Sequence, residues 1–279
     1  MNIKEKSDLQ LEILISTMNR TSLDFLDAMF INNSTSVYNI LIINQTSADM
    51  LLQSNRANIR IVNSFERGLP SSRNLAISNA IGDICLIADD DLEYEKDFEK
   101  AIINAFAKYE EADIITFQMT DETGKLYVEY PDIIRHDKKT VETANSVVIC
   151  FKRKSIVEKK VLFNNNFGLG AVFPTANEYV FLRNALKKGL NIFFEPKILL
   201  SHPHFSSGKD SGSDKIVYAR AALFYKYSGI LGYLRLGKYL WMNYNLDILK
   251  FNELLPKYLI GLKGIKTYRN LLNKGLEKR

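Results

Sequence analysis

The sequence predicts an α/β fold in which a mostly parallel sheet is flanked by helices and followed by a C-terminal helical segment. Short apolar runs alternate with segments whose apolar residues recur at helical spacing. The runs are apolar throughout, which is typical of parallel strands buried on both faces. The 279 residues are 46% hydrophobic and 25% charged, as in a folded soluble protein. This composition excludes a disordered chain, a collagen-like repeat and a disulfide scaffold.

The first part of the chain, up to residue 119, contains most of the predicted sheet. Strands are expected at 11–16, 39–45, 59–64, 83–91 and 113–119. Helices are expected at 17–30, 73–82 and 97–112, and the last of these has a strong amphipathic pattern. Gly68 and Pro70 are interpreted as a turn, so that Arg73 begins the second helix.

The rest of the chain is less regular until its C-terminal helices. A strand is expected at 147–153, a Gly- and Asn-rich loop at 164–175 and a helix at 177–189. Short strands at 191–196 and 198–205 and a polar linker at 206–214 complete this region. We therefore expect two parts, residues 1–205 and residues 206–279.

Three polar clusters lie where predicted parallel strands end: Thr17 to Arg20, Asn44–Gln45, and Asp89 to Asp91. Open sheets of this kind bind ligands beyond the carboxyl ends of their strands. Three consecutive aspartates are costly there unless something binds them, and a divalent metal such as Mg²⁺ or Mn²⁺ is the usual solution. One of the three acids could instead cap the helix that follows.

Further candidate site residues lie outside these three clusters. Arg73 at a helix start would favour a phosphate, because helix N-termini attract anions. Glu178 opens the helix after the Gly-rich loop, where an acid is also common for reasons of the helix dipole alone. His202 and His204 lie together after an apolar strand, which raises the chance that one of them is a ligand.

Cysteine usage and targeting features indicate a reducing compartment. Cys85 and Cys150 each lie in an apolar run and are expected to be buried, without metal-binding spacing. The N-terminal residues MNIKEKSDLQ lack the apolar core of a signal peptide. No run approaches the ~20 apolar residues needed to span a bilayer. A cytoplasmic location is therefore expected.

Taken together, these motifs resemble the family-2 glycosyltransferases of the GT-A (Rossmann-like) fold, in particular bacterial enzymes of capsule, exopolysaccharide or lipopolysaccharide synthesis. The resemblance covers about residues 11–205 and rests on the order of STMNR, GLPSSRNLAISNAIGDICLIADDD, FGLGAVFPTANEYVFLRNALKKG and SHPH. It implies an inverting, metal-dependent glycosyltransferase of the hexosyltransferase type. Such an enzyme moves a sugar from a nucleotide-diphospho-sugar, foremost a UDP-sugar, to a hydroxyl of a glycan or lipid-linked acceptor. Residues 1–205 would then be the catalytic domain.

The resemblance also implies roles for individual residues. Nucleotide-sugar contacts fall to Thr17, Asn19, Arg20, Asn44, Arg73 and Asp89. The Mn²⁺ or Mg²⁺ ligands would come from Asp89, Asp90, Asp91 and His202. Glu178 matches the base that takes the acceptor proton, and the loop 166–176 would shape the acceptor site.

The C-terminal part carries the basic excess of the chain. From residue 206 onward there are 14 Lys plus Arg against 5 Asp plus Glu, whereas the rest of the chain is slightly acidic. Aromatic residues alternate with these cations, a pattern that favours contact with an anionic membrane surface. The alternative is a pair of helices packed on the catalytic domain with a solvated basic face. No nucleic-acid partner is expected, because no recognition motif accompanies the charge.

Two other functions stay open at this level. One is a nucleotidyltransferase on a similar sheet, although STMNRTS is not the Gly-rich basic loop of such enzymes. The other is a catalytically inactive sugar-nucleotide-binding or scaffold protein. It is suggested by Ala88 and Asn177, which stand where many family members have acids.

Overall fold

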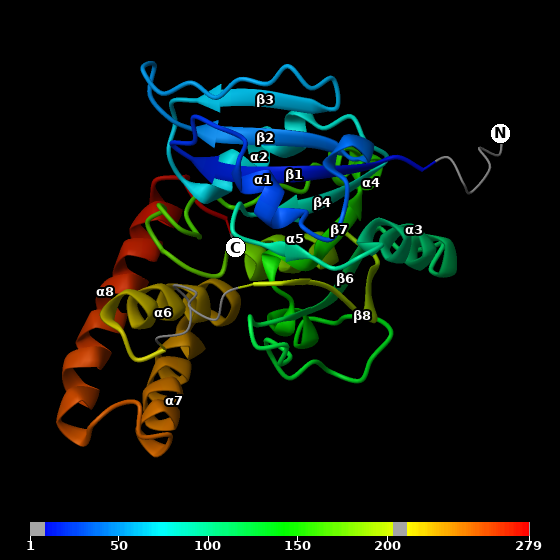
Figure 1. The fold of residues 1–279 in the computed structure, drawn as a ribbon. Coiled ribbons are helices and arrows are strands. Elements are labelled where there is room, and N and C mark those ends of the chain that lie inside the picture. The colour runs from blue at the N-terminus through cyan, green and yellow to red at the C-terminus, as the bar shows by residue number, and fades with distance from the viewer. Residues whose placement is uncertain (1–8, 203–210, 279) are drawn as a thin grey trace. The chain divides into compact units, whose positions relative to one another are not determined.

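The computed structural model describes residues 9–202 and 211–278, which form two compact units (Figure 1). The first unit comprises residues 9–164 and 177–202, and the second comprises 165–176 and 211–278. Unlike the predicted division at residue 205, this grouping takes the loop 165–176 out of the first unit and joins it to the C-terminal helices. His204, the predicted linker before residue 211 and the end of the predicted strand 198–205 lie outside the described residues.

The first unit is built on one sheet, which has eight strands within the described residues (Figure 1). In chain order they are β1 (Leu11–Met18), β2 (Asn39–Gln45), β3 (Ile59–Ser64), β4 (Ile84–Ala88), β5 (Glu93–Tyr94), β6 (Ile114–Thr120), β7 (Ile149–Lys152) and β8 (Ile192–Ser201). Across the sheet the order is β3-β2-β1-β4-β7-β6-β8-β5. Strands β1 to β4 pair in parallel, as do β6 and β8, whereas β7 and β5 run antiparallel to their neighbours. The predicted mostly parallel sheet is confirmed.

Helices cover both faces of this sheet. Helices α1 (Phe25–Met29) and α3 (Phe98–Lys108) pack on one face. Helices α2 (Leu69–Asn79), α4 (Arg153–Glu158) and α5 (Asn177–Lys187) pack on the other. Because successive side chains of a strand point to opposite faces, Ile13 and Ile15 join the first core and Leu14 joins the second. This is why apolar residues occupy adjacent positions in these strands. Both cysteines are buried in these cores, as predicted.

Several predicted boundaries were wrong; for example, the strand expected at 83–91 is β4, which ends at Ala88. The helix expected at 17–30 is only α1, because Thr17 extends β1 and Asn19 then turns the chain with a left-handed φ of 55°. Helix α2 begins at Leu69, with Pro70 in its first turn where a missing N–H costs nothing. The two short strands expected around Pro196 form one strand, β8, which bulges away from β6 there.

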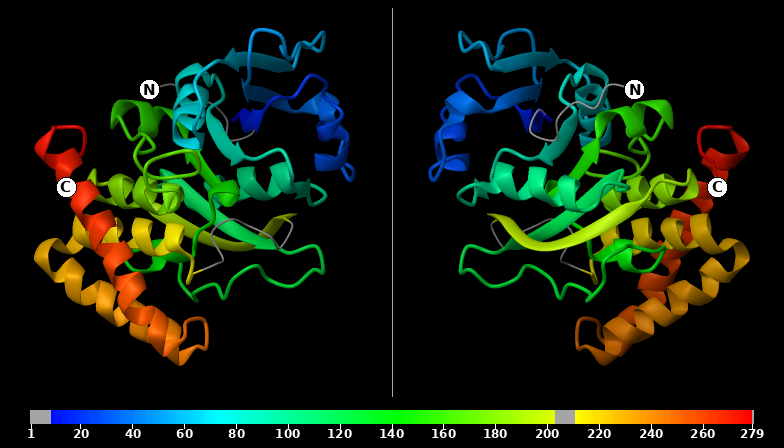
Figure 2. Two further views of the ribbon diagram at one scale, coloured as in Figure 1. Left: turned by 90° about the vertical axis from the view of Figure 1, so that its left-hand side faces the viewer. Right: turned by 90° about the vertical axis from the view of Figure 1, so that its right-hand side faces the viewer.

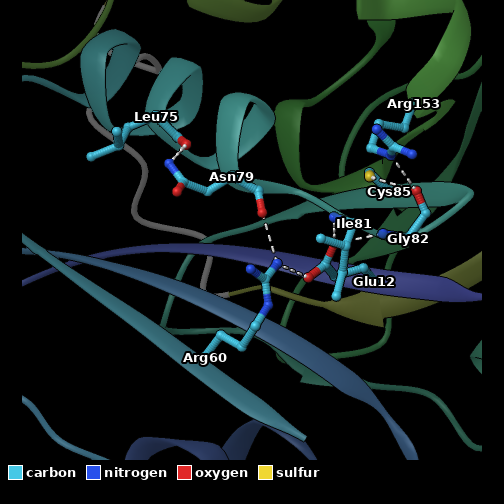
Figure 3. A network of polar contacts seen from close by, with 8 residues as sticks. All are labelled: Glu12, Arg60, Leu75, Asn79, Ile81, Gly82, Cys85 and Arg153. Atoms are coloured by element: carbon cyan, nitrogen blue, oxygen red, sulfur yellow. Dashed lines mark hydrogen bonds and ion pairs between the residues drawn. The ribbon is translucent and has the colours of Figure 1, made fainter.

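A buried carboxylate, that of Glu12, connects neighbouring segments at the end of the sheet where β1 begins (Figure 3). Glu12 is almost fully buried on β1, and its Oε1 accepts a hydrogen bond from Arg60 Nη2 at 2.6 Å. Its Oε2 accepts from the backbone N–H groups of Ile81 and Gly82 at 2.6 and 2.8 Å. A Cβ at Gly82 would lie 2.6 Å from the Glu12 Cβ, so this close approach requires glycine. The network joins β1, β3 and the turn before β4 at the edge opposite the predicted site.

The second unit is a helical bundle with an added loop. Its long helices are α6 (Asp214–Ser228), α7 (Gly232–Asn245) and α8 (Leu254–Asn273), drawn from yellow to red in Figure 2. Phe167 and Phe173 of the loop stack with ring centroids 4.8 Å apart, and each contacts Tyr268 of α8. Within the described residues, no helix is both long and apolar enough to cross a membrane.

Candidate active site

Asp90, the second residue after β4, contacts polar side chains at the end of β1. Its Oδ2 accepts hydrogen bonds from Thr17 Oγ1 at 2.5 Å and from Arg20 Nε at 2.7 Å. Asn44, fully buried at the end of β2, accepts from the Arg20 backbone N–H at 3.1 Å and donates to the Arg20 carbonyl at 2.9 Å. Asn19 is exposed on the turn between them. The three clusters expected at parallel strand ends therefore do meet at one edge of the sheet.

Asp89 belongs to a second group, organised around a buried arginine. Arg73 Nη2 donates to Asp89 Oδ1 at 2.9 Å and to Ser146 Oγ at 3.0 Å, and Nη1 donates to Asn177 Oδ1 at 2.9 Å. The Arg73 side chain is only 2% exposed, and its guanidinium carbon lies 5.5 Å from the Phe163 ring centroid. Because α2 begins at Leu69, Arg73 lies in its second turn and not at its N-terminus. In this conformation it holds Asp89 in place and is closed to solvent.

Asp91 is the most accessible of the three aspartates. Its side chain is 56% exposed, and its Oδ1 lies 3.5 Å from Nε2 of His202, directly after β8. Partial burial raises the pKa of Asp91, and the carboxylates of Asp89 and Asp90 act in the same direction, whereas His202 opposes them. The His202 ring contacts Tyr127 edge-on, with centroids 5.7 Å apart. The three consecutive acids thus have three different basic partners: Arg73, Arg20 and His202.

An open cavity of about 360 Å³ lies beside Asp90 and Asp91, just beyond the carboxyl end of β4. Its lining includes Arg20, Asp90 and Asp91, together with Phe25 and Glu122. The Arg20 side chain is 42% exposed and reaches over the Phe25 ring at 5.1 Å. A cavity of this size falls in the ~300–1,000 Å³ range of small-molecule sites.

Glu178 is not among the residues that line this cavity. It is the second residue of α5 and is half-buried. Its neighbour Asn177 is the residue that accepts from Arg73, so one peptide unit separates Glu178 from the Asp89 group. The loop expected to shape the acceptor site belongs to the other unit.

Two contributors to the site were missed in the sequence. Ser146 shares the Arg73 guanidinium with Asp89, although it lies in an irregular stretch that carries no motif. Asn63, at the end of β3, accepts from Asn44 Nδ2 at 3.0 Å and also binds the backbone of Leu52. Asn63 could have been found, because it is a polar residue at the carboxyl end of a predicted parallel strand.

Comparison with known proteins agrees with this geometry. The family model "Glycosyl transferase family 2" matches residues 13–164. None of the curated proteins matches the sequence. Among solved structures, the chain is similar to S. aureus TarS 1-349, with 12% identity, a TM-score of 0.57 and coverage of 97% of this chain and 93% of that one. The same TarS segment in complex with UDP-GlcNAc gives 13% identity and a TM-score of 0.58, with the same coverage.

The family match covers more than half of the chain, so the protein belongs to glycosyl transferase family 2. The structural likeness, at this low identity, shows the fold. The GT-A fold and the glycosyltransferase class expected from the sequence motifs are therefore confirmed.

Proposed function

We propose that this enzyme transfers a sugar from a nucleotide-diphospho-sugar to a hydroxyl of a glycan or lipid-linked acceptor, with inversion at the anomeric carbon. One observation carries the proposal. In this family-2 chain, the three residues that follow β4 are all aspartates, and they lie beside a cavity. Asp89 contacts Arg73, Asp90 contacts Arg20, and Asp91 contacts His202. A UDP-sugar is the proposed donor, supported by the UDP-GlcNAc complex of the structurally similar TarS.

The Thr17, Arg20, Asn44 and Asp90 group is proposed to bind the nucleotide end of the donor. Arg20 uses its Nε to hold Asp90, while its side chain stays 42% exposed at the cavity. A guanidinium has five N–H donors, so the outer ones can reach a diphosphate. Thr17 and Asn44 fix the position of Arg20 and Asp90 from two neighbouring strands.

A divalent metal is proposed to bind at Asp91 and His202, which offer one carboxylate and one imidazole. No group of three or more His, Cys, Asp or Glu side chains suited to a metal occurs within residues 9–202 and 211–278. Mg²⁺, however, commonly uses only one or two carboxylates together with substrate phosphates. Asp91 and His202 would hold the ion, because Asp89 and Asp90 are engaged by arginines. A bound Mn²⁺ or Mg²⁺ would neutralise charge on the departing diphosphate.

Glu178 is proposed as the general base. Its carboxylate takes the proton of the acceptor hydroxyl while that oxygen attacks the anomeric carbon. The bond from the anomeric carbon to the diphosphate oxygen breaks, and the nucleoside diphosphate leaves with the electron pair. Attack opposite the leaving group inverts the anomeric centre. Arg73 holds Asp89 and α5 together, because its guanidinium donates hydrogen bonds to Asp89 and to Asn177, the first residue of α5.

The base assignment is tested by Glu178→Gln. This change keeps the size of the side chain and removes its basicity, so transfer should fall by at least ~10²-fold while donor affinity changes little. Turnover of a panel of nucleotide sugars and calorimetry of UDP binding measure the two effects. Glu158→Gln, on an exposed position of α4, is the matched control. Full activity of the Glu178 variant would exclude the assignment. If the unmodified enzyme neither transfers nor hydrolyses any donor, the chain is a binding protein.

The metal assignment is tested by Asp91→Asn. The variant should lose the part of UDP affinity that depends on Mn²⁺ or Mg²⁺ and keep the metal-independent part. Asp132→Asn, at an exposed position, is the control. Calorimetry that shows an unchanged metal dependence would move the site away from Asp91.

We further place this enzyme at the inner face of the cytoplasmic membrane, in the synthesis of a surface polysaccharide such as a capsule. The net positive charge of the C-terminal residues supports this location, since the cytoplasmic leaflet is anionic.

A further inference from the structure

The outer side of α7 carries exposed apolar residues, with Arg235 and Lys238 between them. Leu234, Trp241 and Met242 are exposed on it, as is Leu246 just after the helix. Side chains such as Leu240 point the other way, into the core of the second unit. In the turn after α7, Phe251 is 71% exposed, and Leu255 at the start of α8 is 68% exposed. We call the following six residues the apolar face: Leu234, Trp241, Met242, Leu246, Phe251 and Leu255.

The hairpin that carries the apolar face has a basic excess: residues 232–273 contain seven Lys or Arg against two Asp or Glu. Neither α7 nor α8 contains an Asp or Glu. Arg235 and Lys238 are exposed on α7 between the apolar residues, and Lys250 is exposed in the turn. Between the two helices, Asp247 and Glu253 are the only acids. A complementary partner for this face therefore has both an apolar region and negative charge.

The aromatic residues lie together where α7 gives way to α8. Trp241 and Tyr244 have ring centroids 5.3 Å apart, and Tyr244 and Phe251 are 6.1 Å apart. Helices α7 and α8 form a hairpin (Figure 2). Trp241 and Tyr244 lie near the end of α7, and Phe251 lies in the turn between the helices. Aromatic rings of this kind are enriched at the boundary between lipid headgroups and acyl chains.

Two occupants have to be compared for such a surface. A second copy of the chain, related by a two-fold axis, would place Arg235 and Lys238 against the same cations of its partner, with few carboxylates to offset them. An anionic bilayer offers phosphate and carboxylate groups to those cations and acyl chains to the apolar face. Charge complementarity therefore favours the bilayer.

We infer that the apolar face is the membrane-docking surface of this protein, and that it inserts Trp241 and Phe251 into the interface of an anionic bilayer while Arg235 and Lys238 contact lipid headgroups. The inference deepens the membrane location proposed above, and it assigns that location to one side of one helical hairpin. An amphipathic surface of this kind lies in the interface and does not cross the membrane.

Trp241 provides a direct probe, because it is the only tryptophan of the chain and is 54% exposed. We expect its emission to shift to the blue when the full chain is titrated with phosphatidylglycerol vesicles, and brominated acyl chains to quench it. Higher salt should weaken this binding, since screening reduces attraction to the lipid charge. The inference would be overturned if the emission spectrum stays unchanged and no more protein sediments with the vesicles than in a control without vesicles. Equal binding to phosphatidylcholine vesicles would overturn the role of the cations.

Variants then locate the surface. Phe251→Ser and Leu234→Ser should each weaken vesicle binding about tenfold, because each removes a large side chain from the lipid contact. Phe65→Ser is the matched control, since Phe65 is 66% exposed in the first unit and should have no effect. Arg235→Gln with Lys238→Gln should remove most of the preference for anionic lipid. Lys138→Gln with Lys139→Gln, exposed in the first unit, should not.

Two further measurements separate this inference from its alternatives. Sedimentation equilibrium that shows a dimer disrupted by Phe251→Ser would overturn the inference in favour of a second copy. Donor turnover with a soluble acceptor should be unchanged in the Phe251 and Leu234 variants. If vesicle binding is present but no donor is turned over, the proposed transfer reaction fails and the docking surface stands.

Discussion

Arg73 is the residue whose replacement tests the organisation of the site most sharply. We consider Arg73→Met, which keeps much of the side-chain volume and removes the guanidinium. The native group donates to Asp89, Asn177 and Ser146 at 2.9–3.0 Å and packs over Phe163. Its side chain is 2% exposed, so water cannot take over these contacts without a rearrangement.

The expected cost follows from the groups left behind. Removing one partner of a buried ion pair costs ~3–5 kcal/mol, largely because the other charge stays uncompensated. Asp89 is 29% exposed and can be partly rehydrated, which places the cost at the low end. We therefore expect the free energy of unfolding to fall by about 3 kcal/mol. Arg73→Lys keeps the charge but loses the fork that reaches three acceptors, so it should cost about half as much.

Urea unfolding followed by circular dichroism measures this loss. Trp241 fluorescence reports the helical unit separately, so a transition of the sheet-containing unit can be assigned. Arg56→Met, at an exposed position, should stay within ~0.5 kcal/mol of the native protein. A loss below about 1 kcal/mol for Arg73→Met would refute the reasoning, because it would mean that the guanidinium does not hold Asp89 and α5 together.

Two other predictions concern stability. Burial lowers the pKa of His136 to about 4 in the folded protein, from about 6.5 when unfolded, so the unfolded chain binds more protons and about 3 kcal/mol of stability should be lost as the pH falls from 6.5 to 4. Urea midpoints across this range should show a smaller loss for His136→Gln, and an identical loss would contradict the assignment. Gly264→Ala should destabilise the helical unit by ~1–3 kcal/mol, because its Cβ would collide with the Tyr218 carbonyl oxygen of α6. Gly237→Ala, on open α7 surface, should instead raise the thermal midpoint slightly, and equal effects of the two changes would exclude a packing cause.

Much of the sheet was predictable because its signal is local. The runs 11–16, 39–45 and 59–64 are mostly apolar, and each forms a parallel strand. The helix starts were harder. Pro70 is compatible with a turn and with the first turn of a helix, and only the packing of α2 on the sheet decides between them.

The candidate site was predictable where it follows strand ends. Thr17 and Asp90 are 73 positions apart in the sequence, and Arg20 and Asn44 are 24 positions apart. Parallel pairing of β1 with β2 and β4 nevertheless brings the carboxyl ends of these strands together. The contact between Arg73 and Asn177 spans 104 positions and depends on how α2 and α5 pack on the same face of the sheet. No local pattern could encode it.

The sequence by itself determined the class of fold, the family-2 motifs and the basic character of the C-terminal residues, because composition, apolar period and motif order are properties of neighbouring residues. Only the tertiary structure decided which basic group holds which aspartate, that Arg73 is buried beneath Asp89, and that the loop 165–176 packs with the C-terminal helices. It also decided which apolar side chains of α7 stay exposed. These features depend on burial and on contacts between residues far apart in the chain, which the free energy of the whole fold selects.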